Sequence, residues 1–132
     1  MARMSGQRTS RTQRAAAIVG GAFGVAGIVA GTRVLSGLDV PDYHVLRWLV
    51  VYNVVTSTAA VVVAVALWRG RRWAAHAAMG LAGAHALVLV ALAALRVTGT
   101  GVANDSLAAM GIRTSVWALA AWTASRSRRA HR

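Results

Sequence analysis

Four long apolar runs, separated by short polar segments, make up most of the 132-residue chain. They predict helices over residues 15–34, 43–68, 73–95 and 106–124. A helix needs about 20 apolar residues to cross roughly 30 Å of bilayer hydrocarbon, so each run is long enough to span a membrane. We therefore expect an all-α integral membrane protein. Its four transmembrane helices would form an antiparallel bundle over residues 15–125, between basic cytoplasmic tails at 1–14 and 126–132.

The composition supports this interpretation. Hydrophobic residues make up 57% of the chain and charged residues 14%, against about 45–50% and 25% in soluble domains. One globular core could not cover four such runs, so the lipid bilayer is the first partner that the composition predicts. The chain has no cysteine, which excludes disulfides, thiolate metal sites and cysteine nucleophiles.

The net charge of +12 is concentrated in the two tails and in the segment from Arg69 to Arg72. The aspartates fall in the other two loops, at Asp39, Asp42 and Asp105. Because Lys and Arg gather on the cytoplasmic side of membrane proteins, this distribution predicts a multi-pass protein of the bacterial inner membrane with both termini cytoplasmic. The basic tails would contact anionic lipid headgroups. The placement of the charge argues against nucleic-acid binding.

Glycines recur in the first run at intervals of four, three and four residues: Gly20, Gly24, Gly27 and Gly31. This spacing places all four on one face of a helix. Faces of small residues mark close helix contacts in membranes. We expect this face to pack against the other spans of the same chain, with a homo-oligomer through the four glycines as the alternative.

Polar residues interrupt three of the runs at a similar depth. Asn53 and Ser57 share a face of the second run, His85 lies near the middle of the third, and Arg113 interrupts the fourth. A helical rise of 1.5 Å per residue places Asn53, His85 and Arg113 roughly 11–15 Å below the outer surface. The four residues therefore form a predicted intramembrane polar layer.

Arg113 is the costliest member of this layer, since inserting an arginine at a helix centre costs about 2.5–3.5 kcal/mol. We expect it to bond to Asn53 and to backbone carbonyls, which would fix the register of the helices. The alternative is a water-filled cavity in which Arg113 binds an anionic or carbonyl-bearing ligand. His85 would be a neutral core histidine or, alternatively, a proton relay or ligand contact.

Enzymatic chemistry finds no support in the sequence, because no complete nucleophile–base set, carboxylate pair, metal set or phosphate loop is present. We expect no metal and no cofactor. Haem within one chain is disfavoured because His76 and His85 share a helix and lie roughly 13 Å apart along it. The sequence thus predicts a non-enzymatic small membrane protein, a structural or accessory bundle. The alternative is a small carrier or binding protein centred on Arg113.

Overall fold

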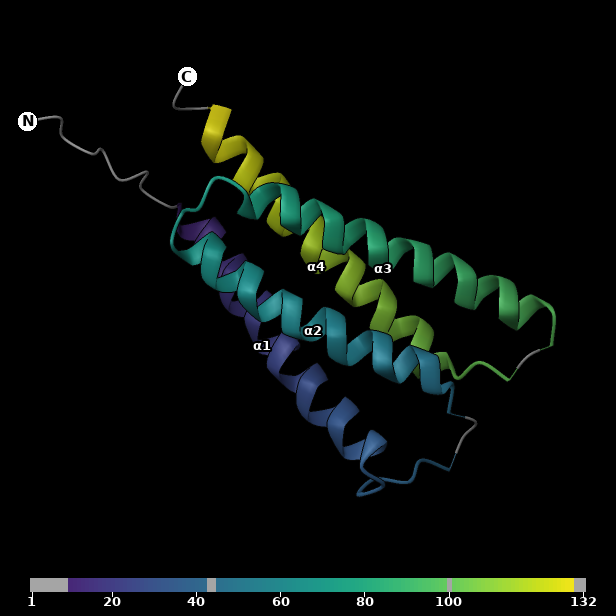
Figure 1. Ribbon diagram of the computed structural model, residues 1–132. Helices are drawn as coiled ribbons and strands as arrows, with labels where there is room; N and C mark the ends of the chain where they lie inside the picture. The colour runs from purple at the N-terminus through teal and green to yellow at the C-terminus, as the bar shows by residue number, and fades with distance from the viewer. Residues whose placement is uncertain (1–9, 43–44, 100, 130–132) are drawn as a thin grey trace, which may run out of the picture.

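The computed structural model describes residues 10–42, 45–99 and 101–129, which form four α-helices. The helices are α1 (Arg11–Leu35), α2 (Arg47–Trp68), α3 (Ala74–Val97) and α4 (Asn104–Arg129). Successive helices run in opposite directions, so α1 begins and α4 ends beside the α2–α3 loop (Figure 1). We call this the terminal end, and the opposite end, with the α1–α2 and α3–α4 loops, the two-loop end. The predicted all-helical fold is confirmed. Of the predicted tails at 1–14 and 126–132, residues 11–14 belong to α1 and 126–129 to α4, and residues 1–9 and 130–132 lie outside the described residues.

The helix boundaries differ from the predicted ones by up to five residues: α1 begins earlier, at Arg11, α4 ends later, at Arg129, and α2 begins later, at Arg47 and not at residue 43. The α1–α2 loop folds back on Arg33. The backbone N–H groups of Leu38 and Asp39 bond to the Arg33 carbonyl at 2.9 and 3.2 Å, and the Arg33 guanidinium bonds to the Asp39 carboxylate at 2.7 and 2.8 Å. Leu46 then enters α2 in an extended conformation.

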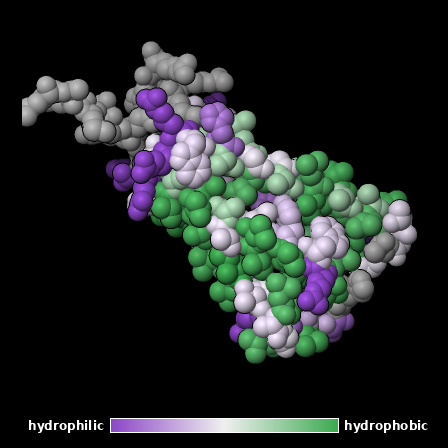
Figure 2. All heavy atoms as spheres, viewed as in Figure 1, coloured by the Kyte–Doolittle hydropathy of each residue, from purple (hydrophilic) through white to green (hydrophobic). Residues whose placement is uncertain are grey.

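Three described helices, α1, α2 and α3, are long and apolar enough to cross a membrane. The outward surfaces of these helices are apolar, as a lipid-facing surface requires. On α3, for example, the side chains of Leu87 and Val90 are 74% and 67% exposed. Figure 2 shows an apolar band between hydrophilic residues at the two ends of the molecule. The remaining helix, α4, is of similar length but carries Arg113, Thr114 and Ser115 within it. The structure thus supports three of the four predicted spans by length and composition.

The helices pack as two close pairs, α1 with α2 and α3 with α4, joined by narrower α1–α4 and α2–α3 contacts. Two hydrophobic clusters fill the interior. The cluster at the terminal end is rich in alanine and centres on Leu67, Ala78 and Trp117. The cluster at the two-loop end contains Leu49, Leu92, Val102 and Met110. The polar layer lies between them along the helices.

The glycine face of α1 is buried inside the chain. A Cβ at Gly20 would lie 3.1 Å from the Trp117 ring of α4, and one at Gly24 would lie 2.9 Å from Val61 of α2. The glycines therefore allow α1 to approach both neighbours closely, which is the packing expected within the chain. A homo-oligomer through the same glycines remains a prediction, and it would require α1 to separate from α2.

Candidate functional site: an intramembrane polar layer

The centre of the layer is a hydrogen bond between α4 and α2. Arg113 Nη1 donates to Asn53 Oδ1 at 2.6 Å. The other terminal nitrogen, Nη2, lies against α1, because a Cβ at Gly27 would be only 3.2 Å away from it. One guanidinium therefore meets three helices. Such a charge-assisted bond is stronger than a bond between neutral groups.

Ser57 fills the space that Gly27 leaves open. Its side chain is buried, and a Cβ at Gly27 would overlap the Ser57 hydroxyl oxygen. Ser57 lies one helical turn from Asn53 on α2, so both side chains face the region where α1 and α4 meet α2. The close approach of α1 to α2 at this level depends on glycine at position 27.

The second hydrogen bond joins α2 to α3. Tyr52 Oη lies 3.0 Å from His85 Nδ1, and the tautomer of the imidazole decides which group donates. The two rings meet edge to face, with centroids 5.8 Å apart and an interplanar angle of 86°. His85 is 2% exposed, so this bond satisfies a buried ring nitrogen.

The structure therefore brings the predicted residues to one level but divides them into pairs. Asn53 and Arg113 bond to each other, and His85 bonds to Tyr52, the residue preceding Asn53. Sequence reasoning missed Tyr52. Its position beside Asn53 places it at the depth of His85, which is the signal that could have identified it.

The charge of Arg113 meets a neutral partner. All three acidic residues of the chain lie at the two-loop end, where Asp39 pairs with Arg33 and Asp105 belongs to the first turn of α4. Every buried side-chain nitrogen or oxygen among the described residues has a hydrogen-bond partner. The layer can thus tie helices together, and its net positive charge would also favour an anion.

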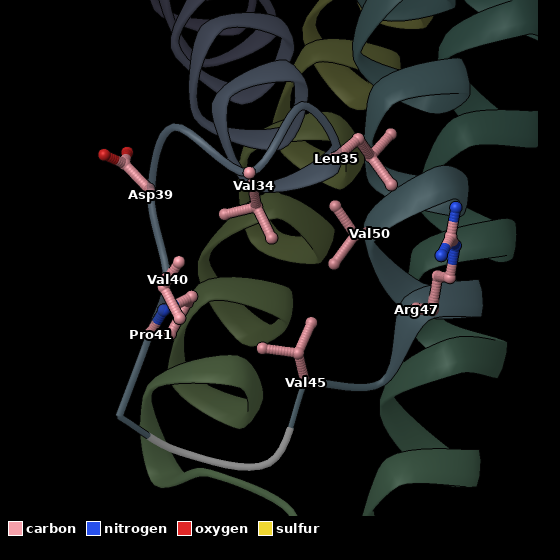
Figure 3. A pocket seen from close by; sticks show the side chains of 9 residues that line it. Val34, Leu35, Asp39, Val40, Pro41, Val45, Arg47 and Val50 are labelled. Atoms are coloured by element: carbon pink, nitrogen blue, oxygen red, sulfur yellow. The ribbon is translucent and has the colours of Figure 1, made fainter.

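Two further observations concern metal binding and ligand binding by the described residues. They contain no group of three or more His, Cys, Asp or Glu side chains placed to hold a metal ion. A cavity of about 300 Å³ lies at the two-loop end beside the α1–α2 loop. Figure 3 shows its mainly apolar lining, with Asp39 and Arg47 on opposite sides. Asp39 is already bound to Arg33, so the cavity presents no convergent polar set.

Comparison of the chain with protein-family models, curated proteins and solved structures finds no match. The geometry of the polar layer is therefore the basis for the functional proposal.

Proposed function

We propose that this chain is a non-enzymatic integral membrane protein whose four helices all cross the bacterial inner membrane, with both termini cytoplasmic. It would act as a structural or accessory bundle held in register by its polar layer. The observation that carries this proposal is the 2.6 Å bond from Arg113 to Asn53, which joins the least apolar helix to the opposite side of the bundle.

The surface of α4 supports its assignment as the fourth span. Its large exposed side chains include Ile112, Leu119 and Trp122, which are apolar or amphipathic. Arg113 is directed inward to Asn53. The exposed Ser115 donates its hydroxyl to the Gly111 carbonyl of the same helix at 2.9 Å. A helix that is mainly apolar outside and carries its charged group inside the bundle is compatible with a lipid environment.

The size of the chain and the position of its polar groups support an accessory role. The loops between helices are short, so a partner would meet the spans, the loops or the tails. The layer gives a physical reason for one register of α2, α3 and α4, since sliding any of these three helices by one turn would separate Arg113 from Asn53 or Tyr52 from His85. Each separation would leave a polar group unsatisfied within the bundle.

The second candidate is a carrier or binding protein for an anionic or carbonyl-bearing ligand at Arg113. The uncompensated charge is the observation that favours it. A ligand with an oxyanion or carbonyl oxygen could replace Asn53 as the acceptor, as charged donors bind such groups strongly.

Thermal unfolding of Arg113→Leu in detergent distinguishes the two roles. The structural proposal predicts a loss of about 1–2 kcal/mol, the range for hydrogen bonds between membrane helices in model peptides. Arg47→Leu, which removes an exposed arginine at the start of α2, should leave stability nearly unchanged. An Arg113→Leu protein as stable as the wild type would contradict the structural role, and stabilisation of the wild type alone by an organic anion would favour ligand binding.

A further inference from the structure

A groove between α1 and α2, near the terminal end, lies apart from the polar layer. Its volume is about 480 Å³, within the roughly 300–1,000 Å³ typical of small-molecule sites. The exposed branched side chains of Ile18, Val25 and Val65 line it. Gly21 and Ala22 contribute little bulk and leave the space between the helices open. This apolar part would accommodate a hydrocarbon chain.

The end of the groove is aromatic and basic. Trp68 and Arg69, the last residue of α2 and its C-cap, complete the lining. The Arg14 guanidinium carbon lies 5.5 Å from the centre of the Trp68 ring, a cation–π contact that brings a second positive charge to this end. Gln13 Nε2 donates to the Leu67 carbonyl at 3.0 Å, which fixes the start of α1 against the end of α2.

We propose that this groove binds one anionic phospholipid, with an acyl chain between α1 and α2 and its phosphate at Arg69 and Arg14. The inference goes beyond the proposed function and rests on it only for the membrane location. Tryptophan prefers the membrane interface, so Trp68 would lie at headgroup level. Basic pockets between spans on the cytoplasmic side bind anionic headgroups, and the groove combines such a pocket with a chain-sized apolar extension.

Native mass spectrometry of the full chain in a non-ionic detergent tests this proposal. Phosphatidylglycerol and phosphatidylcholine with identical acyl chains are the probes. The expected result is retention of one phosphatidylglycerol per chain in preference to phosphatidylcholine. Arg69→Gln should weaken phosphatidylglycerol binding about fivefold, the effect expected of one basic residue near an anionic surface. Ala22→Leu, which fills the groove, should reduce binding of both lipids.

Matched controls separate a built site from general attraction. Arg126→Gln removes an arginine that stacks on Trp122 of α4, outside the groove. Ala59→Leu adds the same bulk at an exposed position of α2 that does not line the groove. Neither should change lipid retention. Equal retention of the two lipids, or equal losses in Arg69→Gln and Arg126→Gln, would overturn the proposal. Either result would leave the proposed structural role of the polar layer unaffected, because that role is tested separately by thermal unfolding of Arg113→Leu.

Discussion

Replacing Asn53 with leucine should destabilise the bundle by about 1.5–3 kcal/mol, the contribution of a hydrogen bond to a charged group. The substitution keeps the number and branching of the side-chain heavy atoms but removes the acceptor 2.6 Å from Arg113 Nη1. Arg113 then retains its charge inside the bundle without its partner. Removing one member of a buried polar pair is costly because the other member remains desolvated. Chemical or thermal unfolding in a fixed detergent measures the change.

A double-mutant cycle isolates this interaction. Combining Asn53→Leu with Arg113→Leu should be less damaging than the sum of the two single changes, with a coupling of about 1–2 kcal/mol. Asn104→Leu is a matched control, because Asn104 also accepts from an arginine, Arg96, but lies exposed at the two-loop end. Its effect should stay within about 0.5 kcal/mol. Additive losses for Asn53 and Arg113 would show that their bond does not stabilise the bundle.

Replacing Gly27 with alanine should cost about 1–3 kcal/mol, the usual range for overpacking a filled interior. The added methyl group would overlap the Ser57 hydroxyl and lie 3.2 Å from Arg113 Nη2. Relief would require α1 to move away from α2, since Ser57 is itself buried between them. The expected observation is a lower melting temperature, measured by circular dichroism in detergent.

Two companion variants make this result specific to packing. Adding Ser57→Ala to Gly27→Ala removes the overlapping oxygen and should recover part of the lost stability. Gly80→Ala on α3 is the control, because a Cβ there meets nothing within 4 Å. Replacing glycine with alanine in an open helix position should be neutral or stabilising by about 0.5–1 kcal/mol. A Gly27→Ala protein that behaves like Gly80→Ala would contradict the close packing of α1 on α2.

The sequence predicted the helices and the depth of the layer because both depend on distance along one chain. Apolar run length determines each helix, and a fixed rise per residue places Asn53 and Arg113 at one level. The pairing of side chains depends on which way each helix faces. Helices α2 and α3 are apolar on nearly every side, so their sequences give little indication of the buried face.

Helix α1 was easier to orient, since the regular spacing from Gly20 to Gly31 marks a single face. Even there, the filling of the Gly27 space by Ser57 depends on the rotation of α2, which one sequence does not specify. Tyr52 was missed for a related reason. A tyrosine within an apolar run is ordinary until a partner such as His85 is known to face it.

The proposed four-span topology is tested most directly by determining on which side of the membrane each loop lies. The natural chain has no cysteine, so each single-cysteine variant carries one reactive thiol. We would label Ser36→Cys, Arg71→Cys, Thr98→Cys and Arg126→Cys with a membrane-impermeant maleimide in intact cells. These positions lie in the three loops and in the last turns of α4, and all four are exposed.

The four-span topology predicts labelling of Ser36→Cys and Thr98→Cys in intact cells, and of Arg71→Cys and Arg126→Cys only after permeabilisation. Labelling of Arg126→Cys together with Thr98→Cys in intact cells would show that α4 does not cross the membrane and would contradict the four-span bundle.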